Sequence, residues 1–428
     1  MTSDTDTDVI VIGAGLAGLG AATRVKQRGL EVMVLEASRR VGGRAWTTNP
    51  PELGGVWFDM GAIWLHDAEH NPLVPMAVEA GETLLRSDQI RHERTFVGNR
   101  LATPAELADY DRAWARFQDM TDRLLARMGD VALAEVTKHL PEDPWAPTVE
   151  AWEGPVICVA DADQFSARDW QRNALTGSNL VPQGGIGRFV SRVLAQGLDV
   201  RLDTPVTLVR WEGPGGRVMA ETANGTVSGK ACVVTVSTGV LASGALRFEP
   251  GLPPDVLDCI AALPMGLALK VALRANGPDR LGLPLHCSVD RQVPASGGVL
   301  MPFQCWPFGR DYVQGWLGGS LAWQLARAGN DAAVEFALGQ LRDLFGSRVD
   351  GLFGGGSSLV VRWDADPWVR GSYSYVPPGK ADARERLAEP LGDGHLLFAG
   401  EACHVPYAGT LAGAWLSGRD AGAAVRVG

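Results

Sequence analysis

The chain has 428 residues, more than one compact core usually holds, so two domains are expected. Hydrophobic residues make up 46% and charged residues 21%, which is typical of a globular protein, and no apolar stretch is long enough to span a bilayer. The net charge of −10 argues against nucleic acid as a partner, because phosphates require a basic surface, and it is compatible with a cationic substrate.

The amino terminus and the cysteines indicate the compartment. The run MTSDTDTDVIVIG is acidic and leads directly into an apolar strand, without the basic region and cleavage site of a secretory signal. The six cysteines have no CxxC spacing, so neither a metal site nor a disulfide framework is expected. These features predict free thiols, no metal, no membrane attachment and a cytoplasmic location.

The first recognisable unit is a strand, a glycine-rich turn, a helix and a second strand. A β-branched run over residues 8–12 precedes the helical pattern, and a strand over residues 31–35 ends on Glu36. Three glycines lie in the turn, Gly13, Gly15 and Gly18. They suit a tight turn, close approach to a pyrophosphate and close helix–strand packing, while the acid suits a ribose hydroxyl. The order predicts dinucleotide binding; a glycine turn in another α/β fold leaves Glu36 unexplained.

A second glycine pair, Gly42 and Gly43, precedes Arg44. Backbone donors beside a fixed positive charge suit phosphate oxygens. Enzymes that use only nicotinamide do not need a second phosphate clamp, whereas flavin enzymes that hold the whole FAD often have one. The clamp therefore favours a flavin.

From about residue 80 to 180 the pattern becomes helical. Thr103 and Glu106 form a capping box around Pro104, and Gly129 is expected to end the helix. Apolar residues repeat at helical spacing and predict a stripe that faces a core: Leu107, Tyr110, Trp114, Phe117, Leu124 and Met128.

The remainder alternates between strands and turns. Asn224-Gly225 predicts a hairpin, residues 232–236 and 395–398 predict buried strands, and a helix is expected over residues 411–425. The cofactor domain is therefore expected to combine residues 1–79, 181–263 and 386–428. Residues 80–180 and 264–385 are expected to form the substrate domain.

Three stretches of sequence resemble one known family over nearly the whole chain. They are DMGAIWLHD at residues 59–67, followed by Asn-Pro-Leu, RWDADPWVRGSYSY at residues 362–375, and FAGE at 398–401 with GTLAG at 409–413. These motifs are similar to those of the flavin amine oxidase superfamily, especially polyamine and spermine oxidases and the catalytic core of flavin-dependent histone lysine demethylases.

The resemblance implies a mixed α/β and α+β fold. A Rossmann-type FAD-binding domain (GR2-like) would carry an inserted substrate domain of mixed sheet and helices. FAD would be held by residues from all three cofactor segments: Gly13, Gly15, Gly18, Glu36, Arg44, Gly61, Ala62, Val206, Gly400, Glu401, Thr410 and Leu411. The last helix would direct its positive end toward the flavin, where it stabilises the anion of the reduced ring. Ser372 stands where monoamine oxidases carry the flavin-linking cysteine, so the FAD is expected to be non-covalent.

The resemblance also implies the reacting groups. Lys270 aligns with a lysine that relatives place near flavin N5, although a surface lysine on a strand edge is the alternative. Tyr373 would form one wall of an aromatic cage, and Thr410 replaces the second tyrosine of monoamine oxidases. Trp64 and His66 would bind substrate, with a satisfied core histidine as the alternative for His66.

The implied reaction is hydride transfer from the carbon beside a neutral amine nitrogen to the flavin. The imine is then hydrolysed, and molecular oxygen reoxidises the flavin to give hydrogen peroxide. A polyamine-like substrate is favoured because Thr410 opens the cage, the charge is negative, and His66, Asp67 and Glu69 lie where a distal nitrogen would reach. An arginine that would grip a carboxylate is absent after Gly61-Ala62, which disfavours amino acids.

Other functions stay open. A monoamine or cyclic amine oxidase shares the whole machinery, and a carbon–carbon desaturase or porphyrinogen oxidase shares the FAD core. A non-catalytic flavin-binding protein is the alternative of a different class. A histone demethylase would need a chromatin-binding module and a coiled-coil insertion, for which the chain has no room. A homodimer is one expected assembly, left open beside the monomer.

Overall fold

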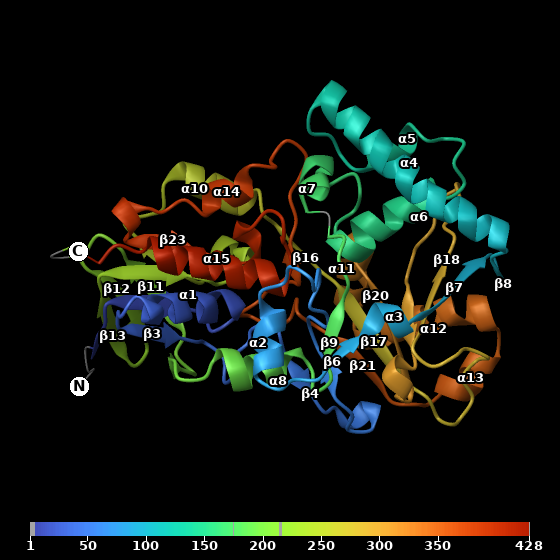
Figure 1. Cartoon of the computed structure of the whole chain (residues 1–428), viewed down its shortest axis with the longest axis horizontal. Coiled ribbons are helices and arrows are strands. Elements are labelled where there is room, and N and C mark those ends of the chain that lie inside the picture. Colours follow the sequence, from blue (N-terminus) through green and yellow to red (C-terminus); the bar gives the residue numbers. More distant parts are fainter. Residues whose placement is uncertain (1–4, 174, 214–215, 428) are drawn as a thin grey trace.

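The structure is a computed structural model that describes residues 5–173, 175–213 and 216–427 (Figure 1). A parallel nucleotide-binding sheet and a seven-stranded sheet lie toward opposite ends of the long axis. Both ends of the chain lie beside the nucleotide-binding sheet. Among the described residues, no helix is both long and apolar enough to cross a membrane. The architecture is the mixed α/β and α+β arrangement expected from the sequence.

The nucleotide-binding sheet is five-stranded, in the order β10-β3-β2-β14-β23, and all its described pairs are parallel. Strands β2, β14 and β23 are fully buried apolar runs, as expected in a parallel sheet that is covered on both faces, whereas Asp199 and Arg201 of the edge strand β10 are exposed. Their bounds are Val9–Ile12 (β2), Val32–Leu35 (β3), Asp199–Arg201 (β10), Ala231–Val234 (β14) and Leu396–Phe398 (β23). Strands from three distant parts of the chain therefore meet in one sheet.

Helices α1 (Leu16–Gln27) and α15 (Leu411–Ala424) lie side by side on this sheet. Their backbones approach closely because glycines line the contact. A β-carbon on Gly418 would overlap the carbonyl oxygen of Ala17, and one on Gly20 would press on the carbonyl of Trp415. The first and last helices are thus joined without intervening side chains.

A second five-stranded sheet, mixed and in the order β1-β13-β12-β11-β15, packs against the nucleotide-binding sheet through a shared apolar core. The predicted hairpin is confirmed, since Thr222 pairs with Gly225; the turn residues between them are Ala223 and Asn224, and Gly225 begins the second strand. The strand bounds are Thr5–Asp6 (β1), Val206–Arg210 (β11), Val218–Thr222 (β12), Gly225–Gly229 (β13) and Arg247–Glu249 (β15).

The other large sheet has seven strands in the order β21-β17-β20-β19-β18-β7-β8. Only the β18–β7 pair is parallel among its described pairs. Its strands are His92–Val97 (β7), Arg100–Leu101 (β8), Leu269–Arg274 (β17), Cys287–Arg291 (β18), Phe303–Cys305 (β19), Tyr312–Leu317 (β20) and Ser358–Val361 (β21). Helices α11 (Gly319–Ala328), α12 (Asn330–Phe345) and α13 (Arg348–Phe353) share its apolar core.

Helices from the 100–172 region form a cap above the seven-stranded sheet: α4 (Pro104–Met128), α5 (Ala134–Lys138), α6 (Ala146–Ala151) and α7 (Ala167–Arg172). The capping box of α4 is confirmed, and the helix ends at Gly129. The predicted stripe is wrong at its two ends, because Leu107 is 40% and Met128 52% exposed. The helix is longer than the core beneath it, so both ends extend into solvent.

The exact domain boundaries stay a prediction. Strand β6 (Leu84–Arg86) pairs with β9 (Leu180–Pro182) close to two expected boundaries. Helix α14 (Ala383–Leu387) crosses the expected boundary after residue 385 and packs against α10 (Pro254–Ala261).

The glycine contact between α1 and α15 predicts a sign reversal between two Gly→Ala substitutions. Gly418→Ala should lower the free energy of unfolding by about 1–3 kcal/mol, because the added methyl meets the backbone of α1. Gly339→Ala in α12 meets nothing within 4 Å and should stabilise by up to about 1 kcal/mol through helix propensity. Thermal unfolding of both variants checks this; a Gly418→Ala protein as stable as Gly339→Ala would contradict the close packing.

Candidate active site

The glycines of the first turn serve different purposes. Gly13 has φ of +103°, and a β-carbon on Gly18 would overlap the carbonyl oxygen of Gly13. At both positions the backbone of the folded chain requires glycine. A β-carbon on Gly15 would meet nothing within 4 Å, so this glycine faces open space. It keeps the backbone accessible to a ligand rather than to another part of the chain.

Glu36 lies at the end of β3, buried beside the same turn. Its carboxylate accepts hydrogen bonds from the backbone N–H groups of Ala14 at 2.6 Å and Ser38 at 2.8 Å. Its carbonyl accepts from Thr204 N at 2.8 Å, which brings the start of β11 at Val206 close to the turn. The acid, the turn and Val206 are thus brought together as the sequence predicts.

Arg44 and Glu401, which are far apart in the sequence, form an ion pair. The guanidinium Nη1 lies 2.9 Å from Glu401 Oε1 and 2.8 Å from the carbonyl of Ser372. The preceding glycine turn is attached to the first turn, since Gly42 N donates to Ala14 O at 2.8 Å. Gly400, before the buried Glu401, has open space on its β-carbon side.

Lys270 lies inside the seven-stranded sheet on β17, between β20 and β21, and is 8% exposed. Its Nζ donates to the carbonyls of Asp59 at 2.8 Å and Gly61 at 3.0 Å. The alternative of a surface lysine on a strand edge is therefore wrong. Gly61 must be glycine, because a β-carbon would overlap the carbonyl of Arg44, and Ala62 N donates to that carbonyl at 3.3 Å.

Burial shifts the pKa values of Lys270 and of Asp59, which lies in the loop that Lys270 contacts. Desolvation lowers the pKa of Lys270 to about 8, opposed by the nearby Asp59 carboxylate. Desolvation also raises the pKa of Asp59 to about 6, although its carboxylate accepts hydrogen bonds from Thr47 and from Ile186 N. The lysine is thus poised to change its charge near neutral to mildly basic pH.

Tyr373 is on β22 (Tyr373–Ser374), and its hydroxyl donates to the carbonyl of Ile157 at 2.6 Å. Burial raises the pKa of this phenol, so it stays neutral. Gly409, with φ of +71°, passes under the ring, where a β-carbon would lie 3.2 Å from Cδ2. The next residue, Thr410, caps α15 by accepting from Gly413 N at 3.0 Å, so Leu411 begins the helix. Tyr373 and Thr410 are therefore neighbours.

His66 belongs to a hydrogen-bonded chain with Asn179 and Asp88. Asp88 Oδ2 accepts from Asn179 Nδ2 at 2.9 Å, which directs Asn179 Oδ1 toward His66 Nδ1 at 2.6 Å. An amide oxygen only accepts, so Nδ1 carries a proton. Burial lowers the pKa of His66, so the ring is neutral and its Nε2 carries a lone pair. The alternative of a satisfied core histidine is thus incomplete, because among the described residues Nδ1 has a hydrogen-bond partner and Nε2 has none.

The two acids beyond His66 have other partners. Asp67 is buried; it accepts from the Tyr407 hydroxyl at 2.7 Å and contacts His70 Nδ1 at 3.3 Å. Glu69 is bound to the backbone N–H of Ser178 at 2.9 Å. The expectation that these acids meet a distal nitrogen is therefore not supported, because both carboxylates hold neighbouring loops in place.

Trp64 packs with its ring centre 6.0 Å from that of Trp316 and 5.8 Å from that of His66. Its Nε1 is buried with no hydrogen-bond partner within the parts of the chain that the structure describes. Trp316 faces Lys270 in the β17–β20 pair. Sequence reasoning missed Trp316, Asn179 and Asp88, which carry no local motif and converge only through the fold.

Comparisons with known proteins agree with this geometry. A family model described as "Flavin containing amine oxidoreductase" matches residues 16–426. Polyamine oxidase 4 of Oryza sativa subsp. japonica is 30% identical over 435 residues, which cover 96% of this chain and 86% of that protein. Lysine-specific histone demethylase 2 of Homo sapiens is 27% identical, over 96% of this chain and 52% of that protein.

Solved structures of putrescine oxidase have the same fold. A triple mutant of that enzyme superposes with a TM-score of 0.81 at 19% identity, over 98% of this chain and 99% of the other. The wild type bound to putrescine gives 0.78 at 18% identity with the same coverage. With the family match over nearly its whole length, the chain belongs to the flavin-containing amine oxidoreductases and is an FAD-dependent amine oxidase.

Proposed function

We propose that this amine oxidase acts on polyamine-like substrates and holds its FAD non-covalently. The observation that carries the substrate assignment is the Asp88–Asn179–His66 chain, which presents a neutral imidazole acceptor beside Trp64. An acceptor at that point suits a second N–H along an amine chain. A simple monoamine has no such group. The polyamine oxidases among the relatives add support.

The residues present fit FAD. Gly15 and Gly400 leave room beside backbone that can approach phosphates, and Arg44 supplies a positive charge between them. Glu36 would hold the ribose, and the backbone of Val206 would meet the adenine. Such a site would need no covalent link, and Ser372 has no thiol; its hydroxyl accepts from Ala268 N at 2.8 Å.

FAD, when bound, supplies the hydride acceptor. Gly61 and Ala62 would pass beneath its ring, and Lys270 would fix that loop through two backbone carbonyls while directing its charge toward the reacting edge. The amino end of α15 at Thr410 and Leu411 would add backbone donors and the positive end of its dipole.

Substrate orientation would fall to the aromatic residues and the histidine. Tyr373 and Trp64 would position the reacting amine by their π faces. The amine must lose its proton before hydride leaves the adjacent carbon, so turnover should rise with pH. His66 Nε2 would accept from the second nitrogen. Molecular oxygen would then take the electrons to give hydrogen peroxide.

A monoamine or cyclic amine oxidase is the second candidate, favoured only by the shared machinery. A desaturase binds apolar substrates and would not need Lys270, Tyr373 and His66 together, and a non-catalytic flavoprotein would not need such groups at the positions that face the substrate. The cytoplasmic location and a homodimer stay predictions.

The first prediction here concerns Gly15. Because its β-carbon direction is empty in the folded chain, Gly15→Val should fold normally yet lose FAD, since the side chain occupies the pyrophosphate's approach. Absorbance at flavin wavelengths measures the bound FAD, and circular dichroism measures whether the variant folds. Retention of full FAD by a folded Gly15→Val protein would remove the phosphate turn from the proposal.

The second concerns Lys270. Lys270→Met should slow flavin reduction or reoxidation by at least about tenfold, the loss typical of one positioned electrostatic group. With a pKa of about 8, the lysine charge is present below that pH and lost above it. The wild-type advantage should therefore shrink as pH rises through about 8. Stopped-flow measurement of both half-reactions from pH 7 to 9.5 decides; a pH-independent ratio contradicts the role of the charge.

The third concerns the chain behind His66. Asp88→Asn releases the amide orientation of Asn179, so kcat/KM for polyamines should fall by about tenfold, as for loss of a charge-assisted hydrogen bond. His66→Ala should do at least as much, and benzylamine turnover should hardly change.

The matched control is Glu69→Gln. Glu69 and Asp88 line the same cavity of about 250 Å³, but among the described residues Glu69 is hydrogen-bonded to Ser178 and not to Asn179. A peroxide-coupled screen of spermine, spermidine, putrescine, benzylamine and amino acids measures all variants. Equal losses in Asp88→Asn and Glu69→Gln would indicate general charge attraction, and a wild-type preference for benzylamine would reject the polyamine assignment.

A further inference from the structure

A buried ion pair lies behind the proposed flavin site and plays no part in the steps described above. Arg384 on α14 and Asp169 on α7 make two hydrogen bonds, Nε to Oδ1 at 2.9 Å and Nη2 to Oδ2 at 3.0 Å. Their side chains are 2% and 3% exposed. Burying such a pair costs desolvation that apolar residues of similar size would avoid, so stability alone does not account for it.

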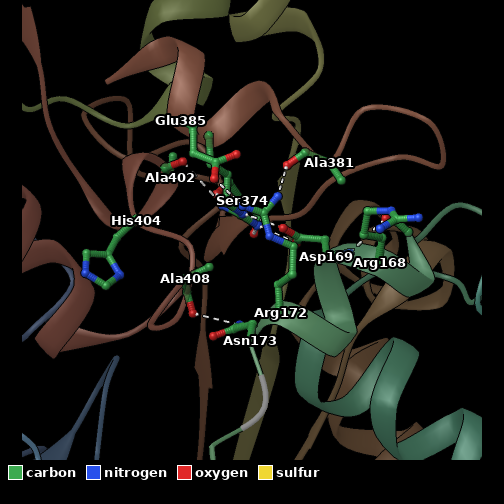
Figure 2. A network of polar contacts seen from close by, with 12 residues as sticks. Arg168, Asp169, Arg172, Asn173, Ser374, Ala381, Glu385, Ala402, His404 and Ala408 are labelled. Carbon is green, nitrogen blue, oxygen red and sulfur yellow. Dashed lines mark hydrogen bonds and ion pairs between the residues drawn. The ribbon is translucent and has the colours of Figure 1, made fainter. Parts of the chain in front are cut away.

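The remaining donors of Arg384 reach toward Glu401. Its Nη1 donates to Ser374 Oγ at 2.9 Å, and its Nη2 to the Ser374 carbonyl at 3.3 Å. Ser374 Oγ in turn donates to Glu401 Oε2 at 2.8 Å, and Ser374 N donates to Oε1 at 3.1 Å. Figure 2 shows Asp169, Ser374 and the Ala402 carbonyl converging on this network.

The direction of every bond is fixed. A guanidinium only donates and a carboxylate only accepts, so the Ser374 hydroxyl must accept from Arg384 and donate to Glu401. Arg44 completes the set by donating to Glu401 Oε1 at 2.9 Å. Charges alternate from Asp169 to Arg44, and each group orients the next. The peptide between Tyr373 and Ser374 is held by the same contacts.

We propose that Arg384 is a positioning residue for the cofactor site. Arg384 is held by Asp169 of α7. Through Ser374 it fixes the carboxylate of Glu401 and the backbone at Tyr373. The inference rests on the proposed placement of Glu401 at FAD. The inference makes FAD retention depend on the Arg384–Asp169 ion pair, which is separated from Glu401 by Ser374.

The structure offers a matched control on the same two helices. Arg172 of α7 forms an ion pair with the exposed Glu385 of α14 (Figure 2), and among the described residues neither side chain is hydrogen-bonded to Ser374 or Glu401. Arg172→Gln therefore weakens the attachment between the helices without touching the network. Arg384→Met removes every donor, and Arg384→Lys restores one charge.

The test is the FAD dissociation constant, measured from fluorescence of FAD released on dilution of the holoenzyme. Arg384→Met should weaken FAD by at least about tenfold, the scale of one charge-assisted hydrogen bond, with partial rescue in Arg384→Lys. Ser374→Ala, which leaves the ion pair intact, should weaken it in the same direction and covers the case of an Arg384 variant that does not fold. Arg172→Gln should stay within about twofold, as expected of an exposed pair.

A double-mutant cycle decides whether the effect passes through Glu401. Arg384→Lys should cost little more once Glu401→Gln is present. Wild-type retention in Ser374→Ala, or equal loss in Arg172→Gln, would overturn the inference. Normal retention in Glu401→Gln alone would instead show that the proposed placement of Glu401 is wrong. The readout does not depend on which amine is oxidised, so a failed substrate assignment leaves it interpretable.

Discussion

The ion pair between Arg44 and Glu401 is the constraint around which the proposed site is arranged. It joins the second glycine turn near the amino end to the short 3-10 turn at Glu401–Cys403, which follows β23 and precedes the last helix. The same guanidinium holds the Ser372 carbonyl, and the Arg44 carbonyl lies where only Gly61 fits. One residue thus ties the phosphate turns, the loop under the proposed flavin position and the aromatic wall into a single geometry.

Around that centre, burial sets the protonation states. Lys270 is desolvated and donates hydrogen bonds to two backbone carbonyls, and burial lowers its pKa to about 8, so its charge is weakly held. Tyr373 is kept neutral, and His66 is kept neutral with a defined tautomer through Asn179. A neutral imidazole suits recognition of an amine, because it does not repel a cationic nitrogen and its Nε2 can accept a hydrogen bond from an N–H group of that nitrogen.

How far the sequence predicted this depends on whether the determinants are local. The glycine turn, the capping box of α4 and the Asn224-Gly225 hairpin are short patterns with one backbone solution, and all were confirmed. The apolar stripe was wrong at Leu107 and Met128, because periodicity does not reveal where the core ends. Asn179, Asp88, Trp316 and the Arg384–Asp169 pair have no local signature; they act through partners that only the fold brings near.

The central claim is tested most directly by mixing the oxidised enzyme with spermidine or benzylamine without oxygen and following bleaching of the flavin absorbance. The account predicts reduction by both, with the polyamine faster at saturation and at lower concentration, and loss of that preference in His66→Ala. Absence of bleaching with every amine, or faster reduction by benzylamine than by any polyamine, would contradict it.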